Sequence, residues 1–194
     1  MRKGIKILAL VVISMLLSCS TVRVDKMSMD RVDYNGSEIK ISGFYFREHW
    51  DDNSIYAHTI LVFYQNGVYL NKLIYSKDLQ EVIEYLNDNR LVSGSKIDSG
   101  PQNIYRLPFN WGIYKVEKQK VLYERWISTP GWARYKTVSS YSDIIDAETL
   151  KDSIRGDIYS YKEYYPKPDS ISCFFPELLS KKDCKILRKR LESR

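Results

Sequence analysis

The chain has 194 residues, of which 44% are hydrophobic, and a formal net charge of +6. This length suits one domain with a substantial core. Arg2, Lys3 and Lys6 contribute +3 and residues 177–194 contribute +4, so residues 19–176 sum to −1. A nearly neutral body excludes a broad nucleic-acid surface, because such a surface needs basic residues clustered on the domain itself.

The first twenty residues are typical of an export signal. Residues 7–17 form an apolar run after a basic start, and they are too few for a transmembrane helix of about 20 residues. The stretch Leu16-Leu17-Ser18-Cys19 resembles the lipobox of bacterial lipoproteins. The resemblance implies that Cys19 carries a diacylglycerol and an N-acyl chain as the mature N-terminus. The alternative is an ordinary signal anchor with a chance cysteine.

The resemblance also implies a cellular location. Ser20 stands where an aspartate would signal retention in the inner membrane, so we expect a lipid anchor in the outer membrane, on its periplasmic or its exterior face. Two or more acyl chains hold a protein stably to a bilayer without a spanning helix. No cofactor other than these covalent chains is expected.

Four parts are predicted along the chain. Residues 1–18 are the signal peptide, 19–38 a lipidated tether, 39–175 a β-rich domain and 176–194 a basic tail. A flexible tether of this length reaches about 25 Å, which would lift the domain off the bilayer.

Alternating and aromatic-rich segments predict the first strands at 39–46, 56–65 and 68–75. Asn66-Gly67 between the last two is a strong hairpin signal, because both residues tolerate positive φ. A helix is predicted over about 77–88, capped by Ser76. Its apolar stripe consists of Leu79, Val82, Ile83 and Leu86, spaced to occupy a single helix face.

A second β block follows an irregular stretch. Further strands are predicted at 110–117, 120–127, 135–141, 142–147 and 157–165, with a short turn at Lys118-Gln119. Short antiparallel strands with regular turns indicate a mainly β fold, a meander that closes into a barrel or a strongly curved sheet.

This pattern resembles uncharacterised small lipoproteins of Gram-negative bacteria with a lipocalin-like β-meander. The similarity rests on FYQNGVY, the strand of Trp111, Gly112, Tyr114 and Val116, IIDAETL and PKPDS. It spans roughly residues 40–170 and implies no activity or catalytic residue.

The tail predicts an amphipathic helix from Pro176, with one apolar and one basic face. It either packs on the body or lies on anionic lipid or lipopolysaccharide. Cys173 and Cys184 would reach an oxidising compartment, where they either pair in a disulfide or stay as two buried thiols.

Candidate chemistry is sparse. His49 lies beside Asp51 and Asp52, which could form a metal or acid–base site, but the same polar run is typical of a solvated turn. His58, in the middle of a strand, is predicted to be packed with one hydrogen bond. No nucleophile elbow, zinc motif or phosphate loop occurs, and no metal site is predicted.

The sequence therefore favours a lipid-anchored envelope protein that binds or supports another molecule without catalysis. One alternative is a carrier of a small apolar ligand in its barrel, and another is a hydrolase-type enzyme using the His49 region. An enzyme would hold His49 beside a second polar group in a concavity. No nucleic-acid partner is expected, and the sequence names no protein or small-molecule partner.

The Cys19 assignment has a direct test. Replacing Cys19 by alanine removes the only thiol in the lipobox, so the variant should stay unprocessed and take up no labelled palmitate, whereas the parent chain should be labelled. Labelling of the variant at the parent level would refute the assignment.

Overall fold

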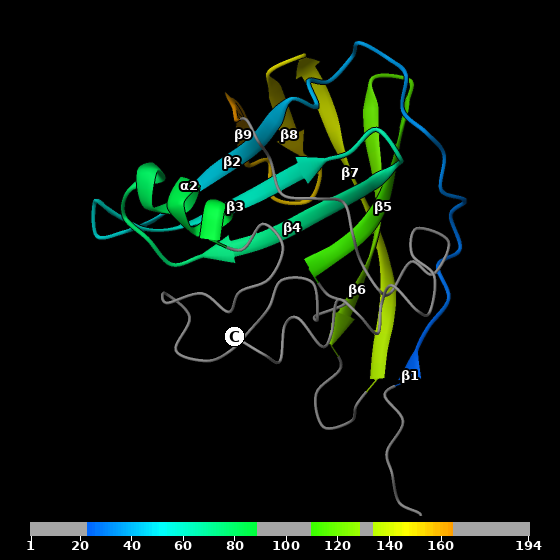
Figure 1. Ribbon diagram of the computed structural model, residues 1–194, viewed down its shortest axis with the longest axis horizontal. Helices are drawn as coiled ribbons and strands as arrows, with labels where there is room; N and C mark the ends of the chain where they lie inside the picture. Colours follow the sequence, from blue (N-terminus) through cyan, green and yellow to red (C-terminus); the bar gives the residue numbers. More distant parts are fainter. Residues whose placement is uncertain (1–22, 89–109, 129–133, 165–194) are drawn as a thin grey trace, which may run out of the picture.

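The computed structural model defines residues 23–88, 110–128 and 134–164 (Figure 1). The cysteines at 19, 173 and 184, the signal peptide and the predicted tail helix lie outside the described residues, and these predictions stay predictions. Within the described part of the chain, no helix is long and apolar enough to span a membrane.

The described strands are β1 (Arg23–Val24), β2 (Gly43–Asp51), β3 (Ser54–Phe63), β4 (Val68–Ile74), β5 (Trp111–Glu117), β6 (Lys120–Ser128), β7 (Arg134–Asp146), β8 (Thr149–Asp152) and β9 (Ile158–Glu163). From β2 to β9, each strand pairs antiparallel with the next, and β9 pairs with β2. The predicted meander is thus a closed eight-stranded barrel. The two-residue β1 adds to β7 in parallel.

The predicted hairpins form by two turn types. Lys118 and Gln119 both have positive φ, 49° and 62°, as a two-residue turn of type I′ requires. At the other predicted turn only Gly67 has positive φ, 74°, and its N–H donates to the carbonyl of Tyr64 at 3.1 Å. This pattern is a type I turn followed by a glycine bulge.

Aromatic side chains fill one half of the barrel interior. Phe63 lies at their centre, with ring centroids 5.6 Å from Tyr45, 6.0 Å from Tyr69 and 4.8 Å from Tyr114. Its side chain is 1% exposed. We call this group the aromatic plug; with Tyr34, Ile39 and buried residues of β6, β7, β8 and β9 it forms one buried cluster.

Glycine is required at one position of β5 that faces the aromatic plug. A Cβ on Gly112 would lie 2.3 Å from a ring carbon of Tyr69 and 2.4 Å from the carbonyl oxygen of Glu124. Only a residue without a side chain leaves room for the Tyr69 ring here, because a Cβ would clash with both the ring and the backbone of the neighbouring strand.

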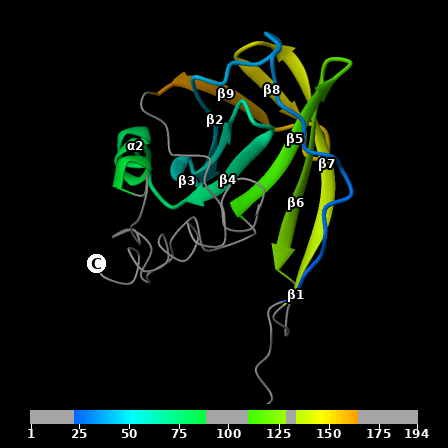
Figure 2. The same ribbon diagram turned by 45° about the vertical axis from the view of Figure 1, so that its right-hand side comes forward.

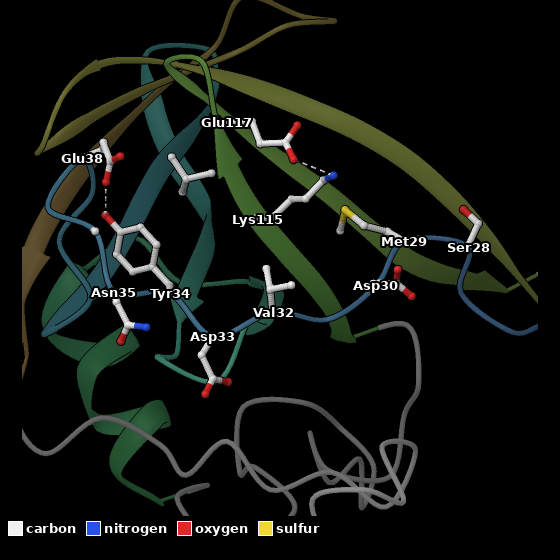
Figure 3. Close-up of a pocket in the computed structure, with 12 residues that line it drawn as sticks. Ser28, Met29, Asp30, Val32, Asp33, Tyr34, Asn35, Glu38, Lys115 and Glu117 are labelled. Carbon is white, nitrogen blue, oxygen red and sulfur yellow. Dashed lines mark hydrogen bonds and ion pairs between the residues drawn. The ribbon is translucent and has the colours of Figure 1, made fainter.

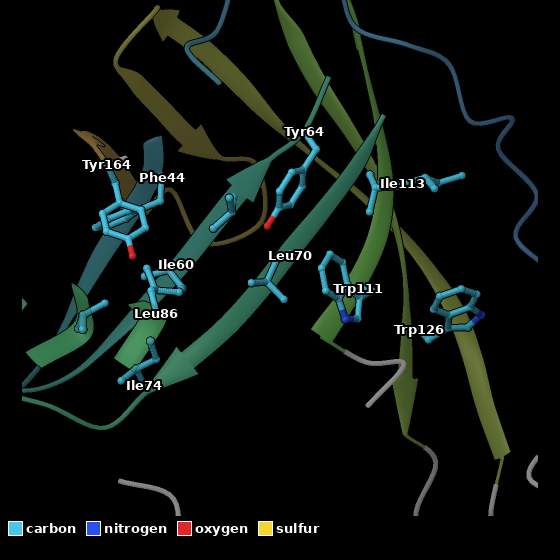
Figure 4. Packing of buried hydrophobic residues seen from close by; sticks show 13 residues of the cluster. Phe44, Ile60, Tyr64, Leu70, Ile74, Leu86, Trp111, Ile113, Trp126 and Tyr164 are labelled. Carbon is cyan, nitrogen blue, oxygen red and sulfur yellow. The ribbon is translucent and has the colours of Figure 1, made fainter. Parts of the chain in front are cut away.

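A second cluster lies on the outer face of the barrel, between its strands and helix α2 (Leu79–Asp88) (Figure 4). Val82 and Leu86 are fully buried, and Leu79 and Ile83 pack against the cluster in part, as the predicted stripe requires. The helix is capped by Asp78 and not by the predicted Ser76: Asp78 accepts the N–H of Gln80 at 2.8 Å, and Ser76 accepts the N–H of Asp78, which precedes the helix, at 3.1 Å.

Residues 25–42, which we call the N-terminal strap, run from β1 along one side of the barrel to β2 (Figures 1 and 2). Glu124 of β6, 1% exposed, accepts the backbone N–H of Ser28 at 2.8 Å and of Met29 at 2.6 Å. Tyr34 and Ile39 are buried in the cluster of the aromatic plug. The described part of the predicted 19–38 tether is therefore packed, because its scattered apolar residues meet an open barrel end.

Other boundaries differ from the prediction. Strand β2 begins at Gly43 rather than at residue 39, because Ile39 turns in to close the barrel. The strands predicted at 135–141 and 142–147 form the single long β7, and β8 was not predicted. The polar run at His49 is strand, with the turn displaced to Asp52 and Asn53.

The aromatic plug predicts a large effect of one substitution. Phe63→Ala should lower the free energy of unfolding by about 3–5 kcal/mol, because it removes a buried ring and leaves a cavity. Urea denaturation measures this change. Tyr141→Ala, in which the ring is 37% exposed on β7, is the control and should cost much less. Equal losses in both variants would contradict the central role of Phe63.

Candidate functional site

The other half of the barrel interior opens into a polar cavity of about 590 Å³, which we call the barrel mouth. Its wall consists of inward-facing residues at one end of the strands, among them Arg47, His49, Thr59, Asn71, Arg125, Ser140, Ser142 and Asp152, with Arg155 from the β8–β9 turn. Leu61, Tyr69, Tyr123 and Tyr159 form the part nearest the aromatic plug. The lining holds three arginines and one lysine against one aspartate.

A hydrogen-bonded chain crosses the β2 and β3 side of the mouth. Arg47 forms an ion pair with Asp157 through Nη1 and donates through Nη2 to Nε2 of His49, at 3.0 Å. Nε2 of His49 also lies 2.7 Å from Oγ1 of Thr59. Because arginine can only donate, Nε2 is the unprotonated nitrogen and carries the accepting lone pair.

Burial, together with the guanidinium groups of Arg47 and Arg155 and the nearby His58, lowers the pKa of His49 below its ordinary value of 6.5. The imidazole is therefore neutral at pH 7. Its Nε2 lone pair is engaged by Arg47 and Thr59, so His49 in this arrangement orients Arg47 rather than offering a free base.

Two other arginines lack such partners. Within the described residues, the side chains of Arg125 and Arg155 make no hydrogen bond or ion pair. The carboxylate of Asp152 is engaged by its own turn, since Oδ1 accepts the N–H of Ile154 at 2.9 Å and that of Arg155 at 2.7 Å. The mouth thus has an excess of uncompensated positive charge.

Two buried polar atoms at the mouth are also unsatisfied. In the described part of the protein, Nε of Arg47 and the hydroxyl of Tyr123 have no hydrogen-bond partner. Tyr123 is 6% exposed, and burial raises its pKa well above the ordinary value, so the phenol stays protonated. The nearby Ser142 hydroxyl opposes that shift. A donor left without an acceptor costs about 1–3 kcal/mol, which a bound acceptor would recover.

The three arginines line the same cavity as Tyr159. The Arg47 guanidinium lies over its ring at 5.6 Å from the centroid. Burial raises the pKa of Tyr159, the charge of Arg47 lowers it, that of Asp152 raises it, and those of Arg125 and Arg155 lower it. Among the described residues, Arg125 and Arg155 therefore present guanidinium donors to this cavity that have no protein acceptor.

The structure separates the residues that the sequence grouped. His49 lines the barrel mouth, whereas Asp51 and Asp52 are exposed at the tip of the β2–β3 hairpin and do not approach it. His58 is 1% exposed with Nδ1 3.1 Å from the Ser76 carbonyl oxygen, as predicted. Across the described residues, no three His, Cys, Asp or Glu side chains are placed to hold a metal ion.

The arginines of the mouth were missed by the sequence analysis. Arg47 and Arg125 each stand two residues beyond a buried tyrosine on the same strand, Tyr45 and Tyr123. That spacing puts an arginine on an interior face of a half-buried strand, which is unusual for a charged residue. This alternation of buried tyrosine and arginine is the sequence signal that indicates an arginine inside the barrel.

A second cavity, also about 590 Å³, lies between the N-terminal strap and β5 (Figure 3). Its polar groups are largely occupied: Lys115 pairs with Glu117 at 2.8 Å, and the hydroxyl of Tyr34 donates to Glu38 at 3.1 Å. Among the described residues that line it, none carries a buried unsatisfied donor.

Comparison with known proteins adds no assignment. No protein-family model matches the chain, and no significant match was found among curated proteins or solved structures. The chemistry of the barrel mouth therefore has to carry the functional argument.

The depressed pKa of His49 predicts a pH dependence. Unfolding returns the imidazole to a pKa near 6.5, so below that pH the unfolded chain binds a proton that the folded chain does not. The contribution to stability is present above pH 6.5 and lost as the pH falls below it. The melting temperature should therefore drop less between about pH 8 and about pH 5.5 in His49→Gln than in the parent.

Proton NMR provides the direct measurement. The His49 imidazole should titrate below pH 6.5 in the folded protein, and Arg47→Gln should move its pKa upward by removing one nearby charge. A midpoint above 6.5 in the parent chain would contradict the described hydrogen-bonded arrangement.

Proposed function

We propose that this chain is a lipid-anchored binding module of the bacterial outer membrane, without catalysis, whose barrel mouth binds a small anionic ligand. The anchor follows from the lipobox-like stretch at Cys19. The ligand class follows from the mouth. The observation that carries the proposal is the set of three arginines that line the mouth, two of them without a partner among the described residues.

The energetics favour an anion. Guanidinium groups bind carboxylate and phosphate oxygens through paired, charge-assisted hydrogen bonds. An apolar ligand would instead remove water from Arg125 and Arg155 without replacing its hydrogen bonds, at a cost of several kcal/mol. The polar lining of the mouth therefore argues for an anionic ligand over the apolar ligand of a carrier barrel.

Two further donors belong to residues of the mouth. Nε of Arg47 and the hydroxyl of Tyr123 are buried and have no hydrogen-bond partner among the described residues. A ligand oxygen that reached either of them would supply the acceptor it lacks. The mouth volume of about 590 Å³ lies within the range of small-molecule pockets, so the anion can be part of a larger molecule.

The test measures stabilisation by anions. Inorganic phosphate and citrate should each raise the melting temperature, because a ligand that binds only the folded state stabilises it by about 2.7 kcal/mol at one hundred times its dissociation constant. Chloride at matched ionic strength controls for general salt effects.

Matched variants locate the effect. Arg125→Gln should abolish most of the anion-dependent rise without lowering stability in the absence of ligand, because Arg125 has no protein partner to lose. Lys136→Gln removes one charge from an exposed position of β7 and should keep the full response. Equal responses of the two variants, or no response of the parent to either anion, would overturn the proposal.

A further inference from the structure

We propose that the anion bound at the barrel mouth is the phosphate-bearing headgroup of a membrane lipid, and that the mouth faces the bilayer to which the chain is anchored. This inference rests on the proposed function and on the anchor at Cys19. The length of chain before the first fixed residue, the strand register and the side chains around the mouth support it.

The chain between the anchor and the barrel is short. Strand β1 begins at Arg23, and the next residue but one is held twice: Asp25 donates its N–H to the Tyr135 carbonyl at 2.9 Å and accepts from Nε1 of Trp126 at 2.7 Å. From Cys19 to Arg23 there are four residue steps, which span at most about 14 Å when fully extended. The barrel therefore lies close against the bilayer rather than at the end of a long tether.

Strand register tells which end of the barrel is held there. Val24 pairs with Tyr135, and Arg125 of the mouth pairs with Val138, three residues further along β7. Three residues of strand measure about 10 Å. The strap then runs away from this point, and its residues Tyr34 and Ile39 cover the aromatic plug at the opposite end. The anchored end and the open end are the same.

The residues around the mouth suit an interfacial position. Ile154 and Leu73 line the cavity and are 78% and 37% exposed. Tyr56, 42% exposed, lies with its ring 5.9 Å from that of His49, and the neighbouring Trp50 is 60% exposed. Tyrosine and tryptophan concentrate at membrane–water interfaces, where one edge of the ring meets the acyl region and the other meets water.

The depth of the cavity limits which part of a lipid can enter. The aromatic plug fills the barrel beyond Tyr69, Tyr123 and Tyr159, so an acyl chain has no channel to follow. A headgroup phosphate can reach the arginines while the acyl chains stay in the bilayer. The exposed aspartates at 51 and 52 lie beyond His49 on the same hairpin and repel an anionic headgroup. The arginines can therefore attract the headgroup only if it enters the mouth.

The experiment uses the full, acylated chain reconstituted into vesicles that contain lipids brominated on their acyl chains. One set is phosphatidylcholine alone, and the other is an equal mixture with phosphatidylglycerol. Bromine quenches tryptophan only near the acyl region, and the contribution of Trp50 is the difference between the parent and Trp50→Phe. Trp50 should be quenched more strongly in the mixture than in phosphatidylcholine.

Matched variants connect this quenching to the mouth. One arginine at an anionic surface is worth about a five-fold change in the bound fraction, so Arg125→Gln should lower the ratio of docked to undocked chain by about that factor. Lys118→Asn removes one charge from the exposed β5–β6 turn at the opposite end of the barrel, away from the bilayer, and should leave the ratio within two-fold of the parent. Added glycerol phosphate should compete and reduce the Trp50 quenching in the parent chain.

The outcomes separate this inference from the proposed function. If phosphate and citrate stabilise the protein but Trp50 is not quenched in the mixed vesicles, the mouth binds a soluble anion and only the membrane inference fails. If neither result is obtained, both proposals fail. Quenching that persists unchanged in Arg125→Gln would show contact of the rim without a bound headgroup and would overturn the assignment. Palmitate incorporation that survives Cys19→Ala would remove the positional argument and overturn it too.

Discussion

Packing around Phe63 is the constraint on which the rest of this barrel depends. An eight-stranded barrel has an interior only wide enough to be filled by side chains or to hold one small ligand. Here one half of the interior is filled, because tyrosines from several strands meet Phe63, and the other half is left open as a cavity. Gly112 permits this by letting the Tyr69 ring lie directly on the β5 backbone. The floor of the mouth is therefore the surface of the aromatic plug.

The same strands supply both halves of the interior. Along β2 the inward positions are Tyr45, Arg47 and His49, and along β6 they are Tyr123 and Arg125. Apolar burial around the aromatic plug stabilises the folded state. The like charges at the mouth repel one another and destabilise it, so the plug offsets their cost. Sites that bind ligands commonly keep such unfavourable contacts, because the ligand and not the protein completes them.

The N-terminal strap packs on the barrel and also leads to the proposed membrane anchor. Glu124 holds the backbone of Ser28 and Met29, and Tyr34 completes the closed end. A segment that would otherwise be a loose linker thus becomes part of the core. With an acyl anchor at Cys19, the proposed consequence is a short, directional attachment, in which the open end of the barrel and the membrane lie on the same side.

The sequence by itself determined the local structure. Alternation and aromatic content specified a β-meander, Asn66-Gly67 and Lys118-Gln119 specified two hairpins, and a helical spacing specified the buried stripe of α2, because each depends on neighbours in the chain. The predicted environment of His58 followed from the same alternation.

Only the tertiary structure decided which residues share a level of the barrel. Arg47, Arg125 and Arg155 line one cavity because the register of seven strand pairs and the β9–β2 closure bring them to the same end of the barrel, and single-sequence patterns carry no information about cross-strand partners far apart in the chain. The same limit explains why the sequence predicts a tether where the structure has the packed strap, since its few apolar residues become core only where they meet the end of a barrel.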